Sequence, residues 1–195
     1  MLPPTCDIAF KEWAAICEAL AIGQQTIILR KGGIHEGHAG FRVAHRHFWL
    51  FPTYLHQEAD REKLVPEAWP VLKSTAEERL ADDRIPLNLL AVVTDVIELQ
   101  DEQQLPQLAG WHWWSARTVL ERFHYRQPGL FLLLVRTYKT PAVMEIPNSP
   151  HFAGCRSWVE LPQPISTASL TPVIPESEFQ TLRTKIMASI GAFQV

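Results

Sequence analysis

The sequence predicts an α+β fold with a mixed, largely antiparallel sheet or a small barrel, and with helices at the N- and C-terminal ends. Segments with strand and helix patterns do not alternate regularly along the chain, which disfavours a doubly wound parallel sheet. The 195 residues are 47% hydrophobic and 20% charged, which suits one well-packed core. We therefore expect a single domain over residues 1–195, divided into an N-terminal helix-hairpin (1–57), a barrel-like part (87–161) and a C-terminal helix (176–195).

The N-terminal part is predicted to be a helix followed by a hairpin. Asp7 is a plausible N-cap, and Gly23 is a stop signal at the other end. Between them, apolar residues recur at helical spacing, namely Phe10, Trp13, Ala14, Cys17, Leu20 and Ala21. Residues 25–30 have the β-branched pattern of a strand that enters a turn at two glycines. A second strand over residues 41–51 would complete a hairpin with a long loop.

The remaining elements alternate between strands and surface helices. Residues 58–80 predict two short helices, and residues 87–99 predict a strand with both faces largely apolar. Ser115 can cap a helix that runs to about residue 125. Strands are expected over residues 129–139, 142–146 and 157–161, then a proline-marked linker and a helix over 178–193. The layout of this later half is similar to the small β-barrels of the PUA and ASCH-like class.

Several short motifs carry a resemblance to a known family. They are Phe10-Lys11-Glu12-Trp13, Leu29-Arg30-Lys31-Gly32-Gly33-Ile34, the run from Phe48 to Thr53, and His56-Gln57. With these motifs the chain resembles a bacterial, notably cyanobacterial, family known only as domain of unknown function 1802. The resemblance supplies a family without a reaction, so the function has to be argued from the residues.

The Arg-Lys-Gly-Gly stretch is a candidate anion site. Arg30 and Lys31 place two cations beside a turn at Gly32 and Gly33, where backbone amides can closely approach an oxyanion. No Walker pattern is present, because no Gly-Lys-Ser/Thr follows the glycines. A solvated hairpin turn explains the same residues equally well.

Histidines and aromatic residues follow this stretch. His45 and His47 are two apart on an expected strand, so they share a face with Trp49, while Phe48 and Leu50 would point inward. Aromatic planes beside cations suit a single-stranded or flipped base, although core packing is the usual role of strand aromatics. The histidines could also hold a divalent metal; the candidate ligands are His35, His45, His47 and His56, with Glu36 and His38 nearby. Structural or acid–base histidines are the simpler interpretation.

Other candidates for chemistry are weaker. The run from Trp111 to Trp114 leads into Arg117 and Arg122, whose side chains could form a phosphate-facing rim around a packed tryptophan wedge. The strand carboxylates Asp95, Glu98 and Glu160 lack the Glu-x-Lys spacing of metal-dependent nucleases, and Cys155 and Ser157 have no assignable base.

Composition limits the classes of function. The formal net charge of −3 excludes a wholly basic surface but allows a local basic patch. The three cysteines are widely spaced, and we detect neither a secretory signal nor a membrane span, so a cytoplasmic protein is expected. We therefore expect binding of RNA, DNA or a nucleotide at a surface formed by Arg30, Lys31, Gly32, Gly33, His47 and Trp49, with no cofactor required. The alternatives are a metal-assisted phosphoester hydrolase and a protein-interaction module.

Overall fold

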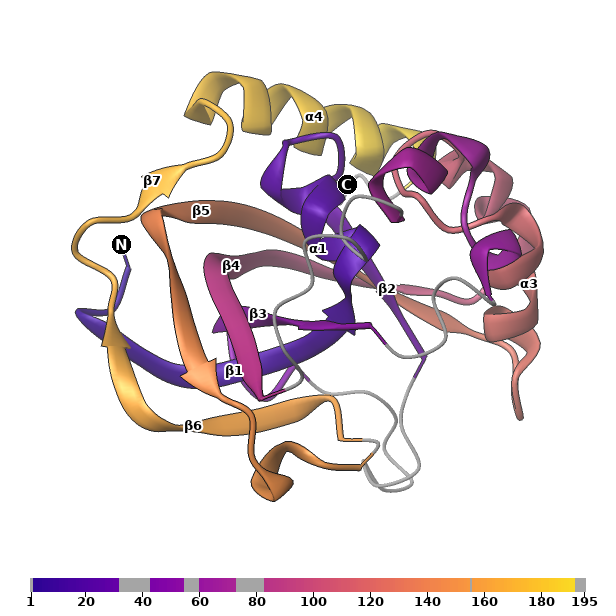
Figure 1. The fold of residues 1–195 in the computed structure, drawn as a ribbon. Coiled ribbons are helices and arrows are strands. Elements are labelled where there is room, and N and C mark those ends of the chain that lie inside the picture. The colour runs from indigo at the N-terminus through magenta and orange to yellow at the C-terminus, as the bar shows by residue number, and fades with distance from the viewer. Residues whose placement is uncertain (1, 32–42, 55–59, 73–82, 155, 192–195) are drawn as a thin grey trace.

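The protein has an α+β fold built on one mixed sheet (Figure 1). The structure is a computed structural model that describes residues 2–31, 43–54, 60–72, 83–154 and 156–191. The strands are β1 (Thr5–Trp13), β2 (Ile27–Arg30), β3 (His47–Thr53), β4 (Arg84–Leu99), β5 (Leu130–Pro147), β6 (Trp158–Ser166) and β7 (Thr171–Pro172). The helices are α1 (Ala14–Ala21), α3 (Ala116–His124) and α4 (Glu176–Ser189). Short 3-10 turns lie at Arg61–Lys63, Pro66–Ala68, Glu102–Gln104, Pro106–Leu108 and Pro150–Phe152.

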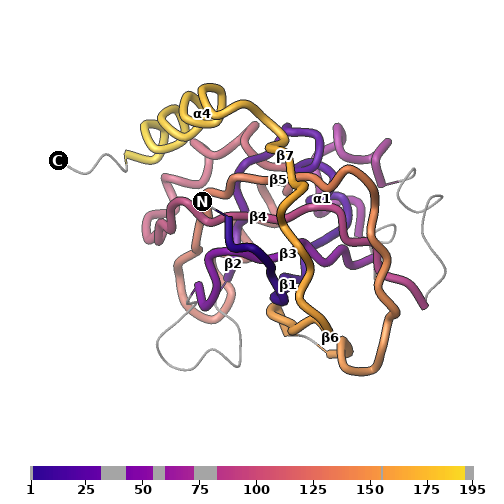
Figure 2. Tube along the Cα trace, turned by 90° about the vertical axis from the view of Figure 1, so that its left-hand side faces the viewer, coloured from indigo at the N-terminus to yellow at the C-terminus, as the bar shows by residue number. Residues whose placement is uncertain are grey.

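The sheet order is β2-β5-β4-β3-β1-β6, with β7 paired to β5. Only the β1–β3 pair is parallel among the described strands, so the predicted class of a mixed and largely antiparallel sheet is confirmed. Backbone pairing leaves β2 and β6 as the two edges, so the sheet is open rather than a closed barrel. The views in Figures 1 and 2 place α4 along one side of the molecule, beyond β5.

The prediction of a helix from Asp7 onward is wrong in its first half. Residues Thr5–Trp13 form β1, and the helix α1 begins only at Ala14. The reason is that β1 is a central strand with apolar contacts on both faces: Ala9 and Phe10 are adjacent and both are completely buried. Burial on both faces removes the two-residue alternation that marks a strand, and the remaining apolar spacing resembles that of a helix.

The predicted hairpin between residues 25–30 and 41–51 is also wrong. The first strand is confirmed as β2, but β2 pairs with β5 at the edge of the sheet, whereas β3 lies between β1 and β4. The Leu-rich β5 run supplies a better partner for β2, since Ile27 lies opposite Leu134 and Leu29 opposite Leu132. The two strands are therefore neighbours in sequence without being neighbours in the sheet.

Most later elements follow the prediction, with longer strands. The strand expected over residues 87–99 is β4, and the strands expected over 129–139 and 142–146 are one strand, β5. Helix α3 begins at the predicted cap, where the Ser115 side chain accepts from the Thr118 amide. β6 extends through Pro162 and Pro164, where a linker was expected; prolines are tolerated there because β6 is an edge strand.

The sheet separates two apolar clusters that share β1 and β3. The larger cluster contains Phe10, Phe48 and Leu50, together with residues of α1, α3, α4, β2 and β5. The smaller cluster contains Ala9, Trp49 and other side chains that lie on the opposite faces of the same strands. At one end of the larger cluster, Arg30 of edge strand β2 reaches Ser157, which directly precedes edge strand β6. The open sheet is therefore curled enough for side chains to bridge its two edges.

Candidate anion-binding site

Arg30 lies where the two edges of the sheet approach each other. Its guanidinium donates to the Ser157 hydroxyl at 2.6 Å and lies 4.4 Å from the centre of the Phe10 ring. Its other terminal nitrogen is 3.6 Å from Oε2 of Glu12. Phe10 and Glu12 are two residues apart on β1, so the strand presents both to the same side, where Arg30 lies across them.

Arg122 is the second arginine at this place. It lies in the last turn of α3, and its guanidinium carbon is 3.6 Å from the centre of the Trp114 ring. Burial lowers the pKa of Arg122 to about 10, while the charge of Glu12 raises that pKa and the charge of Arg30 lowers it. Both arginines are therefore close enough to sense the same carboxylate. We call Glu12, Arg30 and Arg122 the arginine cluster.

The arginine cluster has one more positive charge than negative charge. The Glu12 side chain is almost fully buried, and its Oε1 accepts from the Trp13 amide at 2.8 Å. Within the described residues, Glu12 Oε2 has no hydrogen bond, although Arg30 is within ion-pair distance. One carboxylate thus lies at ion-pair distance from Arg30 and within reach of the charge of Arg122. A partly desolvated cation is most stable when an anion completes its environment, so this arrangement suits an anionic ligand.

Partly exposed aromatic rings lie beside the arginine cluster. Trp13 packs edge-to-face on Trp114, with ring centres 4.9 Å apart, and the ammonium of Lys63 lies 5.9 Å from the Trp13 ring. Trp158 packs on Phe10 at 4.7 Å. Trp13 and Trp158 each retain some solvent exposure, whereas Trp114 is buried. Two indole rings are therefore accessible close to excess positive charge.

Lys31, predicted as an anion contact, is already bound within the protein. Its ammonium donates to the carbonyl oxygens of Phe123 at 2.8 Å and Gly129 at 2.7 Å, and also to that of Gln127. Phe123 is in the last turn of α3, where carbonyls lack partners within the helix, and Gln127 and Gly129 follow that turn. Burial lowers the pKa of Lys31. The geometry assigns Lys31 to the support of α3, in contrast to its neighbour Arg30.

The prediction that Trp49 lies on an exposed face with His47 is wrong. Phe48, Trp49 and Leu50 are all buried, because β3 has one apolar cluster on each side. The Trp49 indole N–H donates to the Cys6 carbonyl at 3.1 Å, so this ring is a core residue in the structure. His47 is partly exposed, and burial together with nearby positive charge lowers its pKa.

The metal hypothesis is tested only in part by the described residues. His35 and His56, like Gly32 and Gly33 of the predicted loop, lie outside them. His45 packs edge-to-face on Trp158 with ring centres 5.3 Å apart, so it lies near the arginine cluster. Within the described ranges, no group of three or more His, Cys, Asp or Glu side chains is placed to hold a metal ion. A divalent metal and the hydrolase that would use it therefore stay predictions.

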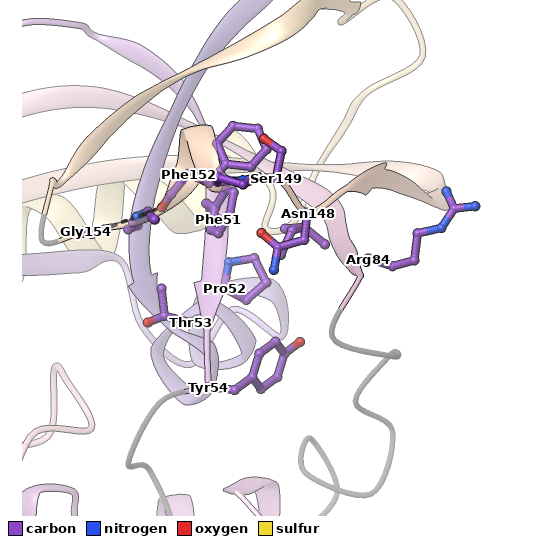
Figure 3. A pocket seen from close by; sticks show the side chains of 13 residues that line it. Phe51, Pro52, Thr53, Tyr54, Arg84, Asn148, Ser149, Phe152 and Gly154 are labelled. Atoms are coloured by element: carbon purple, nitrogen blue, oxygen red, sulfur yellow. Dashed lines mark hydrogen bonds between the residues drawn. The ribbon is translucent and has the colours of Figure 1, made fainter.

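An open hollow of about 610 Å³ lies on the other face of β1 and β3 (Figure 3). Lys11 lines it and donates to the carbonyl oxygens of Phe152 and Gly154, which holds the Pro150–Phe152 turn over Phe51. Arg84, at the rim, extends away from the two phenylalanine rings in Figure 3. Because the central lysine is bound to backbone carbonyls, this hollow is a weaker anion site than the arginine cluster.

The predicted catalytic candidates do not converge on one centre. Asp95 is bound by Arg183 through contacts of 2.8 and 2.5 Å, and this hydrogen bonding lowers the pKa of Asp95. Glu160 lines a separate hollow of about 290 Å³ with His45 and His151. Cys155 lies outside the described residues.

No helix in the described part of the chain has the length and apolar character needed to cross a membrane.

Reasoning from the sequence identified Arg30 and Arg122 but missed Glu12, Trp13 and Trp158 as members of this site. The helix expected over this stretch puts Trp13 on the same face as Phe10 but turns Glu12 to the opposite side. The available signal was the sequence Phe10-Lys11-Glu12-Trp13, which as a strand places Phe10 and Glu12 on one side. A buried glutamate between two aromatic residues requires a cationic partner, and Arg30 provides it.

Comparisons with known proteins give a distant structural likeness and a clear family. Two crystal structures of the ASCH protein from Zymomonas mobilis, one of them a serine-to-alanine variant, are each 12% identical to this chain. The alignment with the variant covers 94% of this chain and 98% of the variant's chain, with a TM-score of 0.43. The alignment with the other structure covers 91% of this chain and 93% of the ASCH chain, with a TM-score of 0.41. A search of curated proteins gave no significant match. The model of the family described as "Domain of unknown function (DUF1802)" matches residues 9–185, so the chain belongs to this family.

Proposed function

We propose that the protein binds single-stranded nucleic acid or its nucleotides through the arginine cluster, with a phosphate group between Arg30 and Arg122. The observation that carries this proposal is the unbalanced charge: Glu12 is the single carboxylate of the cluster, with Arg30 at ion-pair distance and the partly buried Arg122 within reach of its charge. Guanidinium groups bind phosphate through paired N–H donors in a fixed geometry. The protein's net charge of −3 restricts this binding to a local patch.

The adjacent aromatic rings favour a nucleotide over a simple inorganic anion. Trp13 and Trp158 are partly exposed, and each packs on the ring that carries one of the arginines: Trp13 on Trp114, which lies under Arg122, and Trp158 on Phe10, which lies under Arg30. Every base offers a flat face for stacking. Stacking combined with phosphate contacts is the usual way in which proteins hold single strands. We therefore expect an oligonucleotide to bind more tightly than a mononucleotide, and inorganic phosphate to bind more weakly than either.

Substitution of Arg122 tests the proposal, because Arg30 also bridges the sheet edges. We would measure the anisotropy of a fluorescein-labelled oligouridine at several salt concentrations. Arg122→Met should weaken binding about tenfold and reduce the salt slope by about 0.7, the value for one phosphate contact on a single strand. Arg122→Lys retains the charge and should lose less affinity. Arg117→Gln is the matched control, since Arg117 lies on the same helix but is 83% exposed and paired with Glu121.

The outcomes separate binding from folding. Thermal unfolding of each variant shows whether α3 remains intact. In the binding assay, UMP and inorganic phosphate serve as competitors of the labelled strand. Equal affinity and equal salt slope for Arg122→Met and Arg117→Gln would refute the proposal, as would an unchanged protein that binds none of these ligands. Binding of the labelled strand that is insensitive to salt but lost in Arg122→Met would refute the phosphate contact, because it would mean that Arg122 holds the base or sugar instead.

A further inference from the structure

An apolar pocket of about 420 Å³ lies between α3 and the Pro106–Leu108 turn. Apolar side chains provide most of its wall, namely Val65, Leu105, Pro106, Trp114, Val119 and Leu120. Pockets of this size and character commonly enclose small organic ligands, with a few polar groups that fix their orientation. Leu120 of α3 also lines the pocket, and it remains 41% exposed although its side chain is apolar.

His112 supplies a fixed hydrogen-bond donor to this pocket. The side chain is 6% exposed, and its Nδ1 accepts from the Trp114 amide at 3.1 Å. A ring nitrogen that accepts a hydrogen bond carries no proton, so in the neutral ring the hydrogen is on Nε2. Burial lowers the pKa of His112 to about 4, so the ring is neutral near pH 7. Nε2 has no hydrogen-bond partner among the residues that the structure describes.

The Trp114 ring lines the pocket, but its indole nitrogen is covered by protein atoms and does not face a ligand there. The Trp114 indole nitrogen is buried and makes no hydrogen bond with any described residue. Buried donors without partners are rare, because each forfeits the hydrogen bonds it had with water. The His112 Nε2–H is therefore the donor that this wall offers, and the rest of the wall is mostly carbon, which makes it complementary to an apolar molecule with an acceptor.

The charge at the mouth of the pocket disfavours acidic ligands. Glu102 lines the pocket, and one of its carboxylate oxygens lies 2.7 Å from Nε2 of the exposed His124. The Glu102 carboxylate thus places negative charge in the pocket lining. An anionic ligand would be repelled there, and its charge would be desolvated against the apolar wall.

We propose that this pocket binds a small uncharged molecule that is mostly apolar and carries a carbonyl-type acceptor, held by the His112 Nε2–H. Aromatic ketones, esters and amides have this chemistry. The ligand would fill the space between Leu105 and Leu120, with its acceptor directed to the histidine. Trp114 borders both sites, since it lines this pocket and lies under the Arg122 guanidinium, so the pocket is tested with variants of Leu120 and His112 and not of Arg122. Either proposal can fail without the other, because their tests use different ligands.

The test uses the whole protein and the solvatochromic naphthyl ketone prodan, whose emission shifts to shorter wavelength in an apolar site. We expect saturable binding to the unchanged protein. Leu120→Glu places a charge at the pocket and should abolish the shift. Val96→Glu is its matched control, because Val96 is a similarly exposed aliphatic residue (42%) that does not line the pocket. Competition with acetophenone, ethylbenzene and benzoate then identifies the ligand class.

The donor is tested with His112→Asn, in which the amide oxygen can still accept from the Trp114 amide while the Nε2–H is lost. Acetophenone should lose about fivefold in affinity, as expected for one hydrogen bond, while ethylbenzene is unchanged. His151→Asn, outside the pocket, should change neither. An equal effect on both competitors, benzoate as the strongest competitor, or prodan binding that survives Leu120→Glu would each overturn the proposal.

Discussion

Replacement of Lys31 by Met should destabilise the protein substantially. The ammonium donates to three backbone carbonyls, those of Phe123, Gln127 and Gly129, which close the chain reversal after α3. This segment also contains Arg126 with a φ of 66°, a conformation that is unfavourable for a side-chain-bearing residue and needs support from its surroundings. Sequence reasoning alone would predict almost no effect on folding, since Lys31 was expected to contact only a ligand.

The size of the effect follows from the number and type of bonds. A hydrogen bond to a charged group contributes about 1.5–3 kcal/mol, but Lys31 is only partly buried, and the desolvation that lowers its pKa offsets part of the gain. Taking about 1 kcal/mol for each bond gives a loss of about 3 kcal/mol. For a chain of this length, that corresponds to a decrease of about 6–12 °C in Tm.

The assay is urea unfolding followed by tryptophan fluorescence and far-ultraviolet circular dichroism. Lys139→Met is the control, because Lys139 is an exposed lysine on β5. The control should remain within about 0.5 kcal/mol of the unchanged protein, as is usual for surface substitutions. If Lys31→Met also stays within that range, Lys31 does not support α3, and its three carbonyl contacts are not significant in solution.

Three further substitutions or conditions test the buried polar groups and the turns. Lowering the pH from 6.5 to about 4 should reduce the free energy of unfolding by up to about 3 kcal/mol through His112, because the unfolded ring gains a proton before the folded one does. Urea titrations at each pH measure this, and His112→Asn should remove the contribution. Asp95→Asn should lower the free energy of unfolding by about 1 kcal/mol, because it weakens the contact with Arg183. The difference in stability between this variant and the unchanged protein should vanish in acid, since Asp95, whose pKa is lowered by Arg183, stabilises the fold only while it is ionised. Gly23→Ala should cost more than Gly154→Ala in thermal melts: both have positive φ, but only the first would place a Cβ 2.7 Å from an isoleucine methyl group.

The fold class could be predicted from the sequence because most strands are long and apolar. The segments that became β4 and β5 were recognised by their composition, and α3 by its Ser115 cap. The order of strands in the sheet could not be predicted. Pairing of β2 with β5 depends on contacts between residues more than one hundred positions apart, such as Ile27 with Leu134, and local pattern carries no information about such partners.

Faces were predicted poorly wherever a strand is buried on both sides. The alternation in β3 predicts one face exposed to solvent. In the structure both faces are buried: Trp49 packs with Phe51 and Phe152 in the smaller cluster, and Phe48 packs in the larger one. A sequence shows that residues alternate, but it does not show whether a second apolar layer covers the other face. The error in β1, where a central strand was taken for a helix, has the same origin.

The adjacent residues Arg30 and Lys31 contribute to one site in different ways. Arg30 faces Glu12 and Ser157 and belongs to the arginine cluster itself. Lys31 binds the carbonyl of Phe123, the residue directly after Arg122, and so fixes the turn of α3 that carries the second arginine. Because Lys31 would act through Arg122, it is a positioning residue rather than a ligand contact. Of the dense basic pair at the end of β2, the structure thus places Arg30 in the candidate cluster and binds Lys31 to backbone carbonyls; anion binding by this pair stays a prediction.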